Sequence, residues 1–407
     1  MRIHPFRAWR PTAELAARVA APPYDVLDSD EARALAAGNP VSFLHVGKAE
    51  IDLPRELDVH DDRVYAQAVA NLRRFRQEGV LVQEPQLVFY LYRLIRAGHA
   101  QTGLVATCYT EDYECDLIRK HERTLRVKED DRMRHIAGLN SQTGPVFLAY
   151  RPQAALDALA AQVQAGAPLF DFTSPDGVRN TLWRMAEVSP WITAFAQVPV
   201  AYIADGHHRA AAAVRVAQER RAANPVHTGQ EEYNFFLSVL FPSDQLRILP
   251  YNRCVKDLNG LAPAAFLERV RRAGFAVQAG AAPAPEAPRH VSMYLGGAWW
   301  GLSWPEAAGS DAQGALEVSV LQDRLLGPIL GIDDPRKSPR IEFVGGIRGT
   351  AELVQHVDGG RAAVAFSMHP TTMDQLLAIA DAGQIMPPKS TWFEPKLKDG
   401  LFMHDLS

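Results

Sequence analysis

The chain changes character at Ala204-Asp205-Gly206-His207-His208-Arg209. The mostly apolar residues Val198 to Ile203 before this run indicate a strand, and Ala210 to Arg221 after it indicate a helix. A strand that ends at a glycine and continues as a helix leaves backbone N–H groups without partners at the helix start. Together with the positive end of the helix dipole, these donors favour an anion. The run therefore predicts an anion-binding turn between strand and helix.

The side chains of this turn indicate which anion it handles. Two imidazoles and a guanidinium follow Gly206, and we interpret the run as a phosphate-binding turn. Asp205, His207 and His208 are the catalytic candidates, and Gly206 and Arg209 are the phosphate-binding ones. The alternative is an ordinary helix start, with Asp205 as the N-cap and the basic triplet in a solvated first turn. Cations in a first turn oppose the helix dipole unless an anion is present, which disfavours this alternative.

A charged stretch, Arg119 to His135, carries a second candidate site. Three basic neighbours surround Glu122 and would keep it ionised, so that it can act as a general base. The residues around it are predicted to bind phosphate or nucleotide: Lys120, His121, Arg123 and Thr124. The alternative is a solvated helix face stabilised by oppositely charged pairs four residues apart.

Three carboxylate side chains in these segments suggest a metal-binding site. Glu129 and Asp130, together with Asp205, are candidate Mg²⁺ ligands, because Mg²⁺ prefers oxygen donors. Asp205 has a second interpretation, in which it orients His207.

A third cationic segment lies near the C-terminus, in Met386-Pro387-Pro388-Lys389-Ser390-Thr391-Trp392-Phe393-Glu394-Pro395-Lys396. Lys389 offers a point charge for phosphate, and Ser390 and Thr391 offer hydroxyl groups. The segment lacks the glycine frame of a Walker loop. The alternative is a tail held down by Trp392 and Phe393.

The bulk composition excludes several classes of protein. With 43 basic and 47 acidic residues, the net charge of −4 gives no general attraction to nucleic acid or to an anionic membrane. Three cysteines without close spacing indicate reduced thiols, most simply buried ones, rather than a disulfide framework or a zinc site. The N-terminus lacks the apolar stretch of a signal peptide, and no run is long enough to span a membrane. We therefore expect a cytoplasmic protein.

The order of elements predicts a mixed α/β fold. Gln86 to Ile95 and Gly103 to Tyr109 indicate an antiparallel hairpin, while Thr181 to Phe195 reads as a helix. Hairpins mixed with alternating strands and helices favour a mixed sheet over a purely parallel one. The length of 407 residues predicts more than one lobe. We place a catalytic region at residues 1–260 and a C-terminal α/β region at 261–407, whose Lys-Ser-Thr tail is expected to return to the active site.

Six ordered motifs resemble one large bacterial and archaeal family catalogued as a domain of unknown function. They are Ala-Pro-Pro-Tyr-Asp-Val at 21–26, Lys-His-Glu-x-Thr at 120–124, Glu-Asp-Asp-Arg at 129–132, Thr-Gly-Pro-Val-Phe-Leu at 143–148, Ala-Asp-Gly-His-His-Arg at 204–209, and the tail motif at 386–396. The Asp-Gly-His-His-Arg motif also resembles the phosphate-binding turn of the ParB/sulfiredoxin superfamily, which includes the free serine kinases. This resemblance implies a ParB/sulfiredoxin-like core with additional α/β elements. It also implies that Asp205, His207, His208 and Arg209 bind nucleotide phosphates and, less directly, that Glu122 is the base.

These features lead to three functional hypotheses. The first is a phosphotransferase that uses ATP or ADP, and Mg²⁺, to phosphorylate a small hydroxylated metabolite, with free L-serine as the best guess. The second is a phosphatase that acts on phosphoserine or a similar ester. The third is a ParB-like nucleotide-binding regulatory module, which the negative charge and the lack of a basic recognition helix disfavour. A small molecule and a nucleotide are the expected partners, and a homodimer is compatible with these features.

Overall fold

The computed structural model describes residues 1–306 and 311–407, which form two compact units. The first unit comprises Met1–Leu246 and Pro395–Ser407, and the second comprises Arg247–Glu394. Within the described ranges, none of the helices combines the length and the apolar character that a membrane crossing needs. The main segment of the first unit ends at Leu246, before the boundary expected at residue 260. The same unit also includes the last thirteen residues of the chain.

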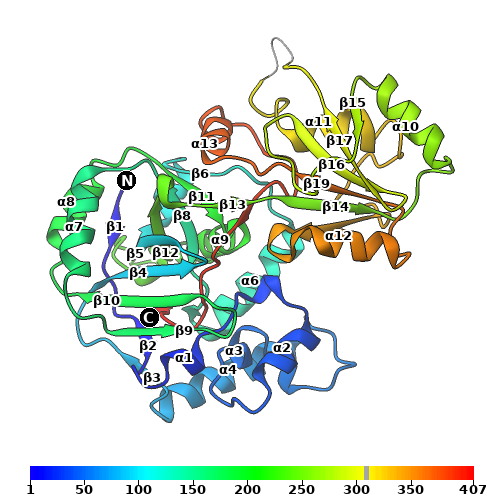
Figure 1. Cartoon of the computed structure of the whole chain (residues 1–407). Helices are drawn as coiled ribbons and strands as arrows, with labels where there is room; N and C mark the ends of the chain where they lie inside the picture. Colours follow the sequence, from blue (N-terminus) through cyan, green and yellow to red (C-terminus); the bar gives the residue numbers. More distant parts are fainter. Residues whose placement is uncertain (307–310) are drawn as a thin grey trace. The chain divides into compact units, whose positions relative to one another are not determined.

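The first unit is built around a mixed sheet in the order β6-β11-β8-β12-β5-β4-β10-β9, with β1 paired to β5 (Figure 1). Its strands are β1 (Ile3–His4), β2 (Trp9–Pro11), β3 (Leu81–Gln83), β4 (Phe89–Arg96), β5 (His99–Tyr109), β6 (Ile118–Arg119), β7 (Ser141–Gln142), β8 (Val146–Tyr150), β9 (Phe170–Thr173), β10 (Arg179–Met185), β11 (Ala201–Asp205), β12 (Phe235–Pro242) and β21 (His404–Asp405). β2 pairs with β3, and β7 with β21, in two small ladders. β8 and β12 are buried along their whole length, which explains their continuous apolar sequences.

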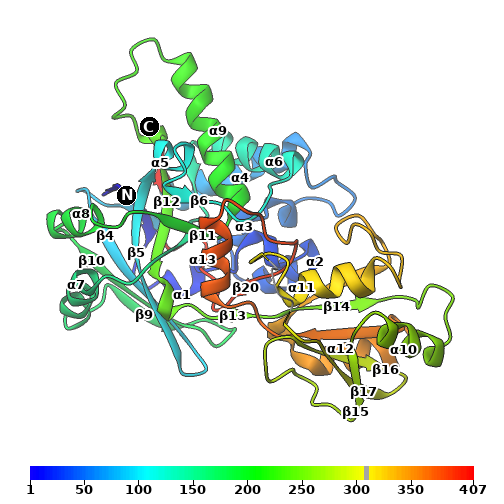
Figure 2. The same cartoon turned by 90° about the horizontal axis from the view of Figure 1, so that it is seen from above.

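The helices of this unit are α1 (Ala16–Val19), η1 (Tyr24–Val26), α2 (Ser29–Ala36), α3 (Leu44–Gly47), η2 (Ala49–Asp52), α4 (Asp62–Gln77), α5 (Thr110–Glu114), α6 (Arg126–Leu139), α7 (Ala154–Gln164), α8 (Ser189–Phe195), α9 (His207–Ala223), η3 (Glu232–Asn234) and η4 (Ser243–Gln245). Figures 1 and 2 show α7 and α8 to one side of β4, β5 and β12, and α9 to the other. The buried alanines of α9 join the apolar core of the sheet, which fixes the position of the helix.

The second unit contains a six-stranded sheet in the order β15-β17-β16-β19-β14-β18 and a separate β13–β20 ladder. Its elements are β13 (Ile248–Leu249), β14 (Tyr251–Val255), α10 (Pro263–Arg272), β15 (Ala276–Ala279), β16 (His290–Leu295), β17 (Ala298–Ser303), α11 (Glu317–Leu321), η5 (Gln322–Leu326), β18 (Ile341–Gly345), η6 (Gly346–Arg348), α12 (Gly349–Asp358), β19 (Val364–Met368), α13 (Met373–Asp381) and β20 (Trp392–Phe393). β13 and β14 belong to this unit because they pair with β20, β18 and β19.

The mixed α/β class and the hairpin of β4 and β5 are confirmed. One predicted element is wrong. Thr181–Phe195 is not a continuous helix, because residues up to Met185 form β10, which pairs with β4 and β9, and only Ser189–Phe195 is helical. Cys108 and Cys254 are buried free thiols as expected, whereas the free thiol of Cys115 is exposed.

Candidate functional site

The strand-to-helix turn forms where it was predicted. β11 ends at Asp205, Gly206 adopts φ +90°, and α9 begins at His207. Gly206 and not Asp205 is the N-cap, and no side chain caps the helix start. The first turn of α9 therefore keeps backbone donors that no side-chain cap occupies.

The two carboxylate oxygens of Asp205 have different partners. Oδ1 accepts a hydrogen bond from the Gly206 N–H at 2.7 Å, and Oδ2 lies 2.5 Å from Lys396 Nζ. Burial alone would raise the pKa of Asp205, but the charges of Lys396 and Arg209 outweigh it and hold the pKa well below its ordinary value. Asp205 is thus a carboxylate held by a lysine of the last chain segment.

Arg209 joins three parts of the first unit. Its Nη1 donates to the Pro145 carbonyl at 3.0 Å, and its Nη2 donates to Asp25 Oδ1 at 3.0 Å. The Arg209 guanidinium also lies 5.2 Å from the ring centre of Tyr24, and the guanidinium of Arg132 lies 3.8 Å from the same ring centre. The sequence motifs around Tyr24, Arg132, Pro145 and Arg209 therefore meet in one cluster.

The two histidines attach the 120–124 motif to α9. His207 Nε2 accepts from the His121 N–H at 3.4 Å, and His208 Nε2 accepts from the Leu125 N–H at 3.0 Å. The rings of His121 and His207 pack edge to face with centroids 4.4 Å apart. Burial lowers the pKa of His121 to about 4. Burial also lowers the pKa of His207 well below its ordinary value, and the neighbouring His121 lowers it further. His207 is thus neutral at pH 7, so the first turn of α9 carries less positive charge than its sequence suggests.

Glu122 lies beside the turn. Its Oε2 is 3.9 Å from His207 Nδ1, and its side chain is 46% exposed. Because His207 Nε2 accepts a hydrogen bond, the proton of the neutral ring belongs on Nδ1, which faces Glu122. The carboxylate is accessible and lies next to a buried imidazole, a position that a general base can use.

The other members of the 120–124 motif are distributed differently. Lys120 Nζ donates to the Tyr113 carbonyl at 3.2 Å and lies 3.5 Å from Asp116, so its charge is engaged at α5. Arg123 is exposed. Thr124 Oγ1 hydrogen-bonds Glu129 Oε1 at the start of α6. His121 and Glu122 are the members that the structure brings to the turn.

The structure places the three predicted Mg²⁺ ligands in separate ion pairs. Glu129 Oε2 and Asp130 Oδ1 lie 2.9 and 2.6 Å from the Arg215 guanidinium, and Asp205 is paired with Lys396. No group of three or more acidic, histidine or cysteine side chains is placed to hold a metal ion in the described part of the chain. The carboxylates are instead held in ion pairs, so this set does not fit a protein-bound Mg²⁺ ion.

The tail motif is divided between the two units. Lys389, Ser390 and Thr391 belong to the second unit, while Lys396 belongs to the first. The Lys389 carbonyl accepts from Arg253 Nη2 at 3.2 Å, and Ser390 Oγ donates to the Pro387 carbonyl at 2.6 Å. The member of the tail motif that reaches the turn in the first unit is Lys396.

Tyr24, Asp25 and Lys396 lie within the sequence motifs but have no predicted role, and Asp399 was not predicted at all. The backbone of Asp399 exchanges two hydrogen bonds with Ala21, at 2.9 and 3.1 Å, which brings the last chain segment against the 21–26 motif. Burial raises the pKa of the Asp399 carboxyl to about 7. Asp399 follows Lys396 by three residues in the sequence, but its pairing with Ala21 across 378 positions is not visible in a local pattern.

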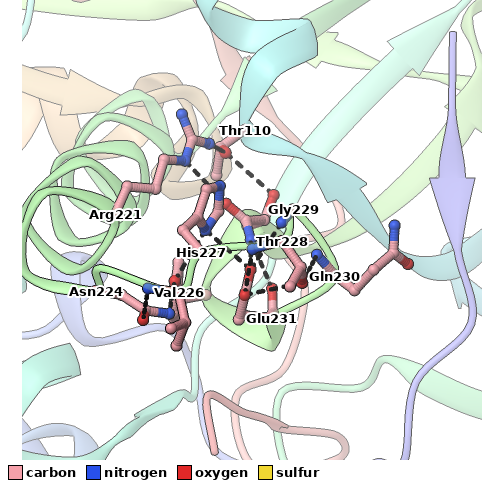
Figure 3. Close-up of polar contacts among 11 residues, drawn as sticks. Thr110, Arg221, Asn224, Val226, His227, Thr228, Gly229, Gln230 and Glu231 are labelled. Atoms are coloured by element: carbon pink, nitrogen blue, oxygen red, sulfur yellow. Dashed lines mark hydrogen bonds and ion pairs between the residues drawn. The ribbon is translucent and has the colours of Figure 1, made fainter.

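The far end of α9 is also fixed. Arg221 Nε donates to Asn234 Oδ1 at 2.8 Å, and its Nη1 lies 2.9 Å from Glu114 Oε2. Figure 3 shows the loop that follows, where Glu231 accepts hydrogen bonds from Thr228 and Gly229 and pairs with His227. Held at both ends, α9 presents its first turn from a rigid helix.

Several solved structures are weakly similar to this chain. A free serine kinase in complex with AMP is 14% identical with a TM-score of 0.40, covering 74% of this chain and 91% of that one. A conserved hypothetical protein from Pyrococcus furiosus is 14% identical with a TM-score of 0.36, covering 72% and 93%. SbnI with a C-terminal truncation from Staphylococcus aureus is 12% identical with a TM-score of 0.41, covering 73% and 85%. Similarity at this level carries no argument about ligand or reaction, and the ParB/sulfiredoxin-like core stays a prediction.

Comparison with curated proteins gives no significant match. The family indicated by the six motifs is confirmed, however, because a family model matches residues 3–324. The chain belongs to the family described as "Protein of unknown function (DUF1015)".

Proposed function

We propose that the protein is a phosphotransferase that moves a phosphoryl group from a nucleotide to a hydroxyl group of a small metabolite, with free L-serine as the best single guess. The observation that carries the proposal is the convergence at the start of α9. There Asp205, Arg209 and Lys396 meet, and the 120–124 motif packs against the same turn through His121 and His207. Phosphoryl transfer depends mainly on positioning and on cationic stabilisation, and this arrangement supports both.

Each residue has a role in this proposal. The backbone donors at the start of α9 and the cations of Arg209 and Lys396 stabilise the donor phosphates. Glu122 accepts the proton of the acceptor hydroxyl as the oxygen–phosphorus bond forms and the bond to the nucleotide breaks. His207 and His208 act as positioning residues, because they hold the segment that carries Glu122.

A requirement for Mg²⁺, a cytoplasmic location and a homodimer remain parts of the proposal. The phosphates of the nucleotide are themselves oxygen ligands for Mg²⁺.

Phosphorus NMR on the purified full-length protein tests the proposal. One sample contains L-serine with ATP or ADP, with and without Mg²⁺, and a second contains phosphoserine alone. New phosphoserine in the first sample establishes a kinase, and free phosphate only in the second makes the protein a phosphatase. Silence in both samples contradicts the proposal for this acceptor.

Variants then test the assigned roles. Glu122→Gln is expected to lower the turnover number by about 10²–10⁴-fold, the usual contribution of a general base. Arg209→Lys keeps a positive charge but cannot serve Asp25 and Pro145 together, so we expect a higher KM for the nucleotide. Glu78→Gln, on an exposed carboxylate after α4, is the matched control. Wild-type phosphotransfer in both site variants would falsify the assignment.

A further inference from the structure

The start of α6 is joined to α9 at two places, and the two helices pack together (Figure 2). His208 Nε2 accepts from the N–H of Leu125, the N-cap of α6, at 3.0 Å. Two helical turns further along α9, the Arg215 guanidinium lies 2.9 Å from Glu129 and 2.6 Å from Asp130. Residues seven positions apart in a helix share one face, so His208 and Arg215 both face the start of α6.

The carboxylate of Glu129 divides its two oxygens between α9 and the loop before α6. Oε2 pairs with Arg215 Nη1, and Oε1 accepts from the Thr124 hydroxyl. The Glu129 side chain is 13% exposed and that of Arg215 is 18% exposed. In the described part of the chain, Arg215 is the one cation paired with Glu129, whereas Asp130 also pairs with Arg126 at 3.2 Å. The orientation of Glu129, and with it that of Thr124, therefore depends on Arg215.

Thr124 lies two residues after Glu122, on the short segment between β6 and α6. Before Glu122, the His121 N–H holds this segment by donating to His207 Nε2. Glu122 Oε2 lies 3.9 Å from His207 Nδ1, which is longer than a hydrogen bond. The Leu125 side chain is 52% exposed and buries little apolar surface. Polar contacts on both sides of Glu122, more than apolar packing, therefore fix where its carboxylate lies.

We propose that Arg215 is a positioning residue for the general base. Through Glu129 and Thr124, it holds the segment that carries Glu122 against α9. The planar guanidinium reaches two carboxylates at once, which the point charge of a lysine does not do. Arg215 itself touches no reacting group in this proposal. The inference rests on the proposed function, because the role of Glu122 as the base comes from there.

Kinetics of Arg215→Met test this role. Arg209 and Lys396, which the proposed function assigns to the nucleotide phosphates, are held by other partners. The KM for the nucleotide is therefore expected to stay within about twofold of the wild type. The turnover number is expected to fall about tenfold, because a small displacement of a reacting group is costly. Arg215→Lys should recover part of that loss. A higher KM with an unchanged turnover number overturns the inference.

Combined substitutions separate positioning from a general structural effect. In a Glu122→Gln background, Arg215→Met should cause no further loss, because the group that it positions is already gone. Thr124→Val keeps the shape of the side chain but removes the hydroxyl, so it should lower the turnover number as Arg215→Met does. Thr124→Ser keeps the hydroxyl and should retain most of the activity. Losses that multiply when Glu122→Gln and Arg215→Met are combined overturn the inference.

Hydrogen–deuterium exchange gives a readout that needs no phosphotransfer. The Leu125 N–H, which donates to His208, is expected to exchange several times faster in Arg215→Met than in the wild type, while the amides inside α9 stay unchanged. Arg179→Met is the matched control. Arg179 binds both oxygens of Asp171, at 2.9 and 2.6 Å, on β10, which lies on the other side of the sheet from β11. Wild-type exchange at Leu125 and wild-type kinetics are expected for this control.

The outcomes separate this inference from the proposed function. Unchanged exchange at Leu125 in Arg215→Met overturns the inference, whatever the phosphotransfer assay shows. A wild-type turnover number in Arg215→Met also overturns it, while the kinase proposal stands. Faster exchange at Leu125 in a protein that transfers no phosphate supports the connection from Arg215 to the segment and contradicts the kinase. Circular dichroism and thermal unfolding establish that each variant is folded.

Discussion

Lys396 Nζ lies 2.5 Å from Asp205 Oδ2, although 191 positions separate the two residues in the sequence. The side chains are only 17% and 30% exposed. The pair connects the turn before α9 with the segment that re-enters the first unit at Pro395. The last thirteen residues are therefore part of the candidate site rather than a dispensable tail.

Breaking this pair from one side is expected to destabilise the protein. Removing one partner of a fully buried ion pair costs about 3–5 kcal/mol, and since Asp205 keeps some contact with water we expect about 1–3 kcal/mol for Lys396→Met. Asp205→Asn combined with Lys396→Met should cost less than the sum of the single changes. Urea unfolding of the four proteins measures the coupling. Strictly additive free energies of unfolding would show that the two charges do not interact.

The stability cost of a substitution at Gly206 should depend on how well the new residue tolerates the left-handed backbone conformation of the turn. Gly206 has φ +90°, and the nearest atoms to an added Cβ, in Arg209 and Val146, lie at ordinary contact distances of 3.5 Å. Backbone strain rather than a clash therefore sets the penalty, which we expect to be about 1–2 kcal/mol for Gly206→Ala. Gly206→Asn is the comparison, because asparagine tolerates the left-handed region better. Equal melting temperatures for wild type and Gly206→Ala would contradict this account.

Acid should destabilise the protein through buried neutral histidines. Burial lowers the pKa of both His121 and His135 from 6.5 to about 4. The unfolded chain therefore binds protons more readily between pH 6.5 and 4, so the stability present above pH 6.5 is lost as the pH falls. Each histidine contributes a slope of about 1.4 kcal/mol per pH unit within that window.

His135→Gln tests this slope. His135 Nε2 lies 3.1 Å from the Val46 carbonyl, and a glutamine amide can donate to the same oxygen. Urea unfolding between pH 7.5 and 4.5 should show a shallower pH dependence in this variant than in the wild type. Identical slopes would mean that His135 is charged in the folded protein.

Local sequence patterns predicted the elements that carry the site because those elements depend on local physics. β11 and α9 follow from an apolar run, a glycine and an alanine-rich helix, and each of these signals lies within a few residues. The same reasoning failed for β10, since Thr181 to Met185 take strand conformation from their pairing with β4 and β9. Tertiary pairing overrode local helix preference there.

The partners of the site residues could not be predicted in the same way. Asp205 looked like an N-cap or a metal ligand, but its partner is Lys396. Glu129 and Asp130 looked like metal ligands, and both form ion pairs with Arg215 on α9. Charge in a sequence indicates that a partner is needed, and only the fold determines which residue provides it. The resemblance of the motifs to a family indicated which segments form the site, although it did not indicate which residues contact one another.

Tyr24 is expected to contribute through its ring rather than its hydroxyl. The guanidinium groups of Arg132 and Arg209 lie 3.8 and 5.2 Å from its ring centre. Cation–π contacts of desolvated groups contribute up to about 2 kcal/mol, so Tyr24→Leu should lose roughly that much stability beyond any packing loss. Tyr24→Phe keeps the ring and serves as the control. If the two substitutions destabilise the protein equally, the ring is not the source of the stabilisation.

Asp399 should give the opposite pH dependence to the histidines. Burial, reinforced by Asp25, raises the pKa of its carboxyl from 3.8 to about 7, although Arg209, Arg132 and the Tyr24 N–H act in the other direction. Between pH 3.8 and 7 the unfolded chain releases this proton before the folded protein does, so stability is lost as the pH rises.

Asp399→Asn removes that loss. Relative to the wild type, the variant should gain about 1.4 kcal/mol per pH unit as the pH rises through this window, and the difference should level off near pH 7. Asp62→Asn, at a side chain that is 95% exposed, controls for the loss of one carboxylate. Unfolding curves of Asp399→Asn that run parallel to the wild type from pH 4 to 7 would show that Asp399 is already ionised at the lower end. In that case the carboxylate would be stabilised by its two arginine neighbours more strongly than burial opposes it.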